Sequence, residues 1–141
     1  MELRGRVINE GEAEGEALVS LRPLSFYGGV DPETGVVTDR DSDIDGQCVS
    51  GKVLVFPHGK GSTVGSYTLY RLAANGKAPA AILNRQCETV VAVGCIISGI
   101  PAVDMLDIDR IRTGDRVRVK GGLVEIEPGR ARGDGEKGRT G

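Results

Sequence analysis

The sequence has few aromatic residues and no strong excess of either charge. Its 141 residues include two phenylalanines, three tyrosines and no tryptophan, and the formal net charge is −2. Proteins that bind single-stranded nucleic acid stack bases on aromatic rings, and those that bind duplexes neutralise phosphates with basic side chains. We therefore expect no nucleic-acid partner.

Long apolar runs are also missing. No run approaches the roughly 20 residues that a helix needs to cross a bilayer. The first residues, Met1 to Arg4, lack the basic and then apolar pattern of a secretory signal. We therefore expect a cytoplasmic protein that has no membrane partner.

Residues that bind metals are sparse. The three cysteines, Cys48, Cys87 and Cys95, form no C-x-x-C pair, and His58 is the only histidine. Structural zinc sites and iron–sulfur clusters normally take four ligands at close spacing. The pattern favours buried, reduced thiols, and we expect no metal or cofactor to be bound by this chain alone.

The acidic segment 39–45 contains the spacing Asp41-x-Asp43-x-Asp45, which also begins an EF-hand calcium loop. However, Lys52 stands at the twelfth position, where a calcium loop needs a glutamate. The pattern favours a solvated acidic loop over a calcium site.

Glycine is abundant, with 22 residues, and this indicates many turns and a β-rich fold. Residues 52–84 have the pattern of a βαβ unit, and residues 116–127 have that of a hairpin. Segment 89–97 fits a buried strand or a buried helix, and its periodicity does not decide between them. We expect strands at 3–9, 17–21, 35–38, 52–56, 80–83, 116–119 and 124–127, a short strand within 100–103, a helix at 63–74, and a turn or loop at 10–16.

These elements predict a mixed α/β or an α+β domain, with helices packed on one side of a β-rich half. The domain is expected to span residues 1–128. Residues 129–141 combine glycine and charge with no aliphatic side chain larger than alanine, so we expect a disordered tail.

The strongest chemical signal is the loop between the predicted strand 52–56 and the predicted helix 63–74. It reads His58-Gly59-Lys60-Gly61-Ser62. Backbone amides and the helix dipole favour negative charge at such a junction, and Lys60 adds a full positive charge. Ser62 is a helix N-cap, part of a phosphate cradle, or a catalytic oxygen stabilised as its alkoxide, and these three interpretations stay open here.

Segments 50–66, 76–82 and 99–104 resemble the aconitase X swivel-domain family, and the resemblance covers nearly all of residues 3–127. It implies a swivelling β/β/α fold, similar to the C-terminal domain of aconitase. It also implies a large aconitase-like partner subunit, whose own cysteines bind an iron–sulfur cluster, expected to be 4Fe-4S. The two subunits together would form a heterodimeric hydro-lyase that is active only as the complex.

The family's proton-accepting serine maps onto Ser62. The implied reaction is the dehydration of (R)-5-phosphomevalonate to trans-anhydromevalonate 5-phosphate, a step of archaeal isoprenoid biosynthesis, whereas bacterial relatives dehydrate a hydroxyproline. Substrate-binding roles are expected for the neighbours of Ser62. Lys60, with Arg40 or Arg85, is a candidate for the substrate carboxylate or phosphate. The predicted substrate-binding residues are Gly59, Lys60, Gly61, Thr63 and Ser66.

Two alternatives belong to other functional classes. Residues 99–103 and 114–117 also resemble the phosphohistidine domain of phosphoenolpyruvate-using enzymes. That domain needs a histidine near residues 86–89, where this chain has none, so a carrier role would fall on His58. The other alternative is a non-catalytic binding or assembly module that uses the same fold.

Overall fold

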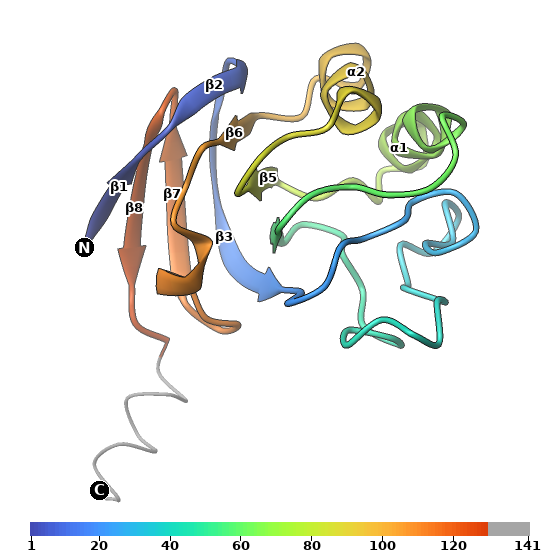
Figure 1. Cartoon of the computed structure of the whole chain (residues 1–141), viewed down its shortest axis with the longest axis horizontal. Helices are drawn as coiled ribbons and strands as arrows, with labels where there is room; N and C mark the ends of the chain where they lie inside the picture. Colours follow the sequence, from blue (N-terminus) through green and yellow to red (C-terminus); the bar gives the residue numbers. More distant parts are fainter. Residues whose placement is uncertain (130–141) are drawn as a thin grey trace, which may run out of the picture.

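The structure, a computed structural model, describes residues 1–129. Figure 1 shows a curved sheet with both α-helices packed against one side of it. The elements are β1 (Glu2–Arg4), β2 (Arg6–Asn9), β3 (Glu12–Val19), β4 (Val53–Phe56), α1 (Gly65–Ala74), β5 (Ala81–Asn84), α2 (Thr89–Ser98), β6 (Ala102–Asp104), the 3₁₀ turn η1 (Ile108–Arg110), β7 (Arg116–Lys120) and β8 (Leu123–Glu127).

The sheet closes on itself through one bent strand. Its order is β1-β8-β7-β3-β4-β5-β6-β2, so β1 and β2 form its two edges although Gly5 alone separates them in the chain. A side chain at Gly5 would collide with the carbonyl oxygen of Asp104, so the bend requires glycine. One part of the sheet, β1-β8-β7-β3, is antiparallel, and β3-β4-β5-β6 is parallel. The predicted mixed α/β fold with β/β/α layers is confirmed.

Alternation along the strands builds two cores. In β4, Val53 and Val55 point into the core enclosed by the sheet, and Leu54 and Phe56 point toward the helices. All four side chains are fully buried, which explains why this strand is apolar throughout. The helices contribute Leu69, Leu72, Val91 and Cys95 to the second core, together with residues of the long irregular segment that follows β3.

Most of the predicted elements are present. The βαβ unit and the hairpin are confirmed, and the open segment 89–97 is the helix α2. The first predicted strand is divided by Gly5, and residues 36 and 37 form isolated β-bridges in place of a strand.

The prediction of a turn at residues 10–16 was wrong, because β3 begins at Glu12. The glutamates of β3 face solvent, and in the ladder with β7 each of them lies opposite a basic residue. Glu14 contacts Arg116 at 3.0 Å and Arg118 at 3.8 Å. Cross-strand pairing with a distant segment therefore makes a strand from residues that look like a loop.

The end of the chain and the acidic loop complete the fold. Gly129 is buried, and its N–H donates to an Asp115 carboxylate oxygen at 3.1 Å, whereas residues 130–141 of the predicted tail lie outside the described residues. In the acidic loop, Asp43 accepts hydrogen bonds from the Ser20 hydroxyl and the Leu21 amide. Within residues 1–129, no helix has the length and apolarity that a bilayer crossing requires.

Candidate functional site

Two loops leave the sheet side by side at the carboxyl ends of parallel strands. β4 and β5 are hydrogen-bonded neighbours, and their last residues, Phe56 and Asn84, are in register. Residues 57–64 lead from β4 to α1, and residues 85–88 lead from β5 to α2. The carbonyl oxygen of Pro57 accepts the N–H groups of the two residues that follow Asn84. Such an edge of a parallel sheet is where α/β folds bind ligands.

Ser62 is exposed on the first of these loops. The amide of Val64 donates to its Oγ atom at 3.1 Å, and the amide of Gly65 donates to its carbonyl oxygen at 3.0 Å. Helix α1 begins at Gly65 with Val64 at the N-cap position, so Ser62 closes a turn just before the helix. Ser62 is therefore not the N-cap that one interpretation made it, although its Oγ does accept a hydrogen bond from the amide two residues on, and that bond would also stabilise an alkoxide.

Close packing explains two of the glycines in the loop. A Cβ atom at Gly59 would lie 2.5 Å from Val91 Cγ2 and 3.0 Å from Glu88 Oε1. Gly61 has φ of +94°, and a Cβ atom there would lie 2.8 Å from Ser25 Oγ. The loop thus packs directly against the start of α2 on one side and against Ser25 on the other.

The sequence analysis missed the segment around Leu24, which supports the other side of the loop. The Leu24 amide donates to the His58 carbonyl oxygen at 3.2 Å, and the Lys60 amide donates to the Leu24 carbonyl oxygen at 3.1 Å. This pairing makes a parallel β-bridge between Leu24 and Gly59. No periodic pattern marks a single bridge inside an irregular stretch, so the sequence carried no signal for it.

An ion pair with a buried carboxylate, between Arg6 and Asp104, lies below the second loop. Arg6 donates to both carboxylate oxygens of Asp104, at 2.9 and 2.7 Å, and the Cys87 amide donates to the same carboxylate at 2.8 Å. Burial by itself raises the pKa of Asp104, but the bonds from Arg6 and Cys87 outweigh it and leave that pKa lowered. Burial, followed by the charge of Asp104, raises the pKa of the Cys87 thiol to about 11. This cysteine is therefore a neutral thiol near pH 7.

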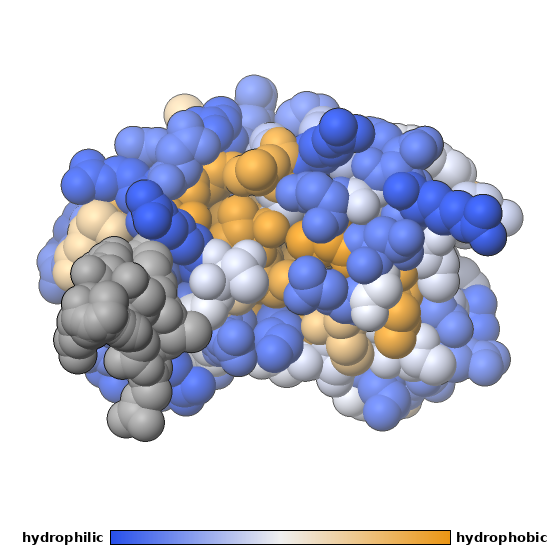
Figure 2. Space-filling view, turned by 90° about the horizontal axis from the view of Figure 1, so that it is seen from below, coloured by the Kyte–Doolittle hydropathy of each residue, from blue (hydrophilic) through white to orange (hydrophobic). Residues whose placement is uncertain are grey.

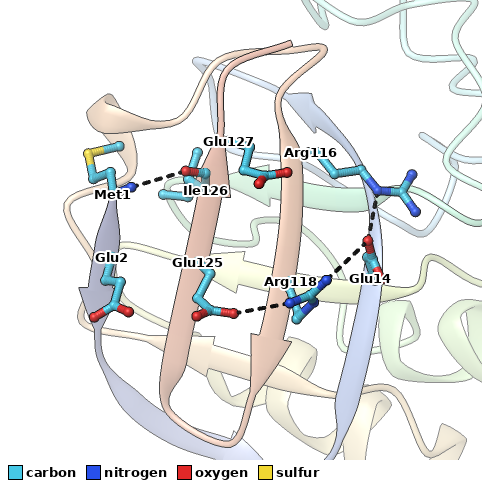
Figure 3. A pocket seen from close by; sticks show the side chains of 8 residues that line it. All are labelled: Met1, Glu2, Glu14, Arg116, Arg118, Glu125, Ile126 and Glu127. Carbon is cyan, nitrogen blue, oxygen red and sulfur yellow. Dashed lines mark hydrogen bonds and ion pairs between the residues drawn. The ribbon is translucent and has the colours of Figure 1, made fainter.

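Several hollows lie on the sheet side of the molecule, and two of them bear on the site. Figure 3 shows the first, of about 220 Å³, on the antiparallel part of the sheet, where Arg118 lies between Glu14 and Glu125. Its basic residues are engaged in ion pairs, and no residue of the Ser62 loop lines it. The second, of about 370 Å³, lies between the end of β3 and η1. Its lining includes Val19, Leu21, Pro57, Arg85, Ile108 and Ile111.

The end of β3 and the 3₁₀ turn η1, which line the second hollow, lie toward the bottom of Figure 1. Figure 2 shows this underside, on which apolar residues gather in a band flanked by hydrophilic ones. Arg85 lies at the hollow and forms an ion pair with Asp109 at 2.9 Å. Arg85, a candidate for binding an anionic group of the substrate, thus already forms an ion pair with a carboxylate of this chain.

A family model described as the aconitase X swivel domain matches residues 2–127. The chain belongs to the aconitase X swivel-domain family. Relatives support this over the full length of the match. The chain is 61% identical over 129 residues to the phosphomevalonate dehydratase small subunit of Thermococcus onnurineus, covering 90% of this chain and 99% of that protein. It is 53% identical over 131 residues to the protein of the same name from Methanosarcina acetivorans, covering 89% and 91%.

A solved structure agrees with the family. The crystal structure of Thermococcus kodakaraensis aconitase X in its holo-form superimposes with a TM-score of 0.89 at 58% identity, covering 91% of this chain and 99% of that chain. The family and the fold that the resemblance implied are therefore confirmed. The match also decides against the phosphohistidine domain as the family of this chain.

In this aconitase X swivel domain, the predicted site residues divide into two groups. Lys60, Gly61, Ser62 and Thr63 are exposed on the loop, whereas Gly59 is buried. Ser66 is half-buried, and its hydroxyl donates to the Val90 carbonyl oxygen at 2.6 Å, which ties α1 to α2. The structure does not test a substrate contact for any of these residues, so these roles stay predictions.

The remaining candidates lie away from Ser62 or have other contacts. His58 is exposed, and its Nδ1 atom lies 2.8 Å from the Gly59 carbonyl oxygen. Arg40 is exposed on the acidic loop. Within residues 1–129, no hydrogen bond or ion pair joins Arg40 to the Ser62 loop.

The cysteines of this chain do not fit an iron–sulfur cluster. Cys95 is buried in the core between the sheet and the helices, and Cys48 and Cys87 are half-buried on different segments. In residues 1–129, no three histidine, cysteine or acidic side chains converge so that they could hold a metal ion. A cluster that serves this domain would need ligands from another chain.

Proposed function

We propose that this chain works in the cytoplasm as the small subunit of a two-subunit hydro-lyase that dehydrates (R)-5-phosphomevalonate to trans-anhydromevalonate 5-phosphate. Ser62 is its proton acceptor. The observation that carries the proposal is an exposed serine oxygen that accepts a backbone amide at the start of a helix. It occurs in a chain whose relatives are named phosphomevalonate dehydratase small subunits.

The local electrostatics suit a serine that acts as a base. A serine hydroxyl is a weak base unless its alkoxide is stabilised. Here the Val64 amide points at the oxygen, the N-terminus of α1 follows, and Lys60 precedes it by two residues. These groups favour the negative form of the Ser62 oxygen. The alkoxide would remove a proton from the carbon adjacent to the one that bears the leaving hydroxyl, which departs as hydroxide. The proton taken up by Ser62 then passes to that hydroxide to give water, and this returns Ser62 to its starting form.

The substrate carries a carboxylate and a phosphate, so its site needs positive charge and free amides. The exposed part of the loop offers both, with the Lys60 side chain and the backbone at Gly61 and Thr63. Gly59 and Ser66 would support these groups from below without contacting the substrate through their side chains, since Gly59 is buried and the Ser66 hydroxyl is bonded to α2. The alternative substrate is a hydroxyproline, which lacks a phosphate. Measuring the dehydration of each of the two compounds by the same complex distinguishes the alternatives.

The large subunit is assigned the iron–sulfur cluster, expected to be 4Fe-4S, because the cysteines here do not converge. The surface beside Ser62 supports a protein partner. Val64, Tyr67 and Tyr70 are exposed along α1. Helix α2 contains no charged residue, and its outer side chains Val93, Ile96 and Ile97 are exposed. Helices that are apolar all round are normally buried, and we expect the large subunit to cover this face.

The test is a substitution of Ser62 by alanine in the complex with the large subunit, assembled anaerobically. Removing a general base lowers kcat by about 10²–10⁴-fold, whereas folding and binding to the large subunit stay unchanged. Dehydration of 5-phosphomevalonate is measured, with circular dichroism and size-exclusion chromatography as checks on folding and assembly.

Ser42→Ala is the matched control. The Ser42 hydroxyl accepts the Ile44 amide at 3.2 Å, in the same kind of turn as at Ser62, but on the acidic loop. This variant loses the same local bond and should keep wild-type activity. A fully active Ser62→Ala complex would refute the proposal. Incorporation of label at His58 from phosphoenolpyruvate would instead favour the carrier alternative.

A further inference from the structure

Asp104 is a buried charge whose role the proposed chemistry of Ser62 does not explain. Its carboxylate has no exposed surface, and it lies at the end of β6, two strands away from β4. It accepts two hydrogen bonds from Arg6 and one from the Cys87 amide. Replacing a buried ion pair by apolar residues of similar volume is often neutral or stabilising, so stability alone does not account for a carboxylate at this position.

The Cys87 bond leads from Asp104 to the Ser62 loop. Cys87 precedes Glu88, the N-cap residue of α2, so the bond fixes the point where that helix begins. The first turn of α2 then meets Gly59, whose missing side chain leaves room for Glu88 and Val91 at 3.0 and 2.5 Å from the Cβ position. Three residues after Gly59 comes Ser62.

On the other side, Leu24 pairs with Gly59, so the loop lies between one β-bridge and the first turn of α2. The position of the Ser62 oxygen therefore depends on where α2 begins. Two side-chain contacts hold the first turn of α2: the Ser66 hydroxyl binds the Val90 carbonyl oxygen from α1, and the Asp104 carboxylate binds the Cys87 amide just before the helix begins.

We propose that Asp104 is a positioning residue for the reaction: through the Cys87 amide it holds the start of α2 against Gly59, and so places the Ser62 oxygen. The proposal rests on the proposed role of Ser62. Asp104 itself does not touch the substrate. Displacing a catalytic group by about 1 Å can cost on the order of 10²-fold in rate, so a support of this kind is visible in kcat.

The substitution Asp104→Asn separates shape from bonding. The asparagine side chain has nearly the same volume, but it carries one acceptor oxygen and one NH₂ group, and both Arg6 and the Cys87 amide are donors. The Cys87 amide and Arg6 Nη2 share one carboxylate oxygen, and Arg6 Nε meets the other, so the new NH₂ group faces a donor in either orientation. Even when asparagine keeps its oxygen toward Cys87, it loses an Arg6 bond and the charge that holds the side chain in place. The test compares D104N with wild type in the assembled complex, and we expect kcat to fall about 10–100-fold while KM changes less than threefold.

Asp115→Asn is the matched control. Asp115 is also fully buried, and its carboxylate accepts the Arg112 amide at 2.9 Å and the Gly129 amide at 3.1 Å. It lies beside β7, in the antiparallel part of the sheet, and does not contact α2 through these bonds. Both substitutions should lower Tm, but only D104N should lower kcat and speed hydrogen exchange in residues 57–64.

A second variant keeps the test decisive if D104N does not fold. Arg6 is largely exposed, so Arg6→Gln should fold, loosen the carboxylate and lower kcat several-fold, whereas Arg6→Lys should restore part of it. The proposal is overturned if D104N and D115N lower kcat equally, or if D104N, or R6Q where D104N does not fold, keeps wild-type kcat. An active Ser62→Ala complex would overturn the proposed function instead, so the two failures are distinct.

Discussion

The two loops at the carboxyl edge of the parallel strands are neighbours, but they are built differently. The loop 57–64 is long and rich in glycine, and it exposes Lys60 and Ser62. The loop 85–88 is short, and its Cys87 amide is bound by the buried carboxylate of Asp104. Under the two proposals above, the exposed loop supplies the reactive group, whereas the buried contacts of its neighbour hold that group in place.

The helices that follow these loops differ as well. α1 carries Arg71 and two stacked tyrosines on its exposed side, with ring centroids 6.3 Å apart. α2 has no charged residue, and its outer face is aliphatic. The loop 57–64, which carries Ser62, therefore leads into the more polar helix α1. The loop 85–88 leads into α2, whose aliphatic face we expect the partner to cover.

The contact between the two loops is broken most directly by Gly59→Ala. The new methyl group would collide with Val91, so the loop must move away from α2. We expect kcat of the complex to fall by about 100-fold, and the free energy of unfolding to fall by about 1–3 kcal/mol. Enzyme kinetics and chemical denaturation measure the two effects.

Gly94→Ala is the control for that substitution. Its Cβ atom would also lie 2.5 Å from a side-chain methyl group, Leu69 Cδ1, but in the middle of α2. We expect a similar loss of stability with less than a tenfold loss of kcat. Equal losses of kcat in the two variants would show that the contact between Gly59 and α2 has no special part in the reaction.

The difference between the helices predicts where the large subunit binds. Ile96→Glu places a charge on the exposed aliphatic face of α2 and should weaken binding to the large subunit at least tenfold, since burying such a side chain is worth about 1.5–3 kcal/mol. Titration calorimetry measures the affinity. Leu21→Glu, at an exposed residue beside β3, is the control and should bind normally. Loss of a self-associated form of the small subunit, with binding to the large subunit intact, would instead assign the face to a second copy.

At low pH, protonation of the Asp104 carboxylate should remove its contribution to the stability of the fold. The pKa of Asp104 is lowered in the folded chain, since bonds from Arg6 and Cys87 outweigh the effect of burial. Its contribution to stability is therefore complete above about pH 4, the ordinary pKa of aspartate, and is lost as pH falls through the lowered value. The Tm difference between wild type and D104N should be largest near neutral pH and should shrink below about pH 4. A difference that stays constant from pH 7 to pH 3 would contradict this.

The smallest effect is expected in the antiparallel part of the sheet, away from both loops. Glu14 lies between Arg116 and Arg118 on the exposed face of β3. Glu14→Gln should change the free energy of unfolding by less than about 1 kcal/mol and leave kcat unchanged. Chemical denaturation at low and high salt measures it, and a large loss of activity would show that this face matters to the reaction.

The elements of the fold that depend on local sequence patterns could be predicted from the sequence. The apolar run at β4, the glycine-rich loop after it and the stop at the end of α1 indicated a βαβ unit, and the structure confirms it. The hairpin of β7 and β8 followed from alternation around a glycine turn. The first half of β3 was mistaken for a loop, because its glutamates become strand residues only when paired with the basic residues of β7.

The sequence by itself therefore determined the serine loop, the βαβ unit that presents it and the family to which the chain belongs. Tertiary structure alone decided what surrounds that loop. Leu24 pairs with Gly59 from a distant part of the chain, and Arg6 reaches Asp104 across 98 positions. The reason is physical: hydrophobic periodicity and turn residues report on neighbours along the chain, whereas a buried carboxylate and its partners meet only after the sheet has closed.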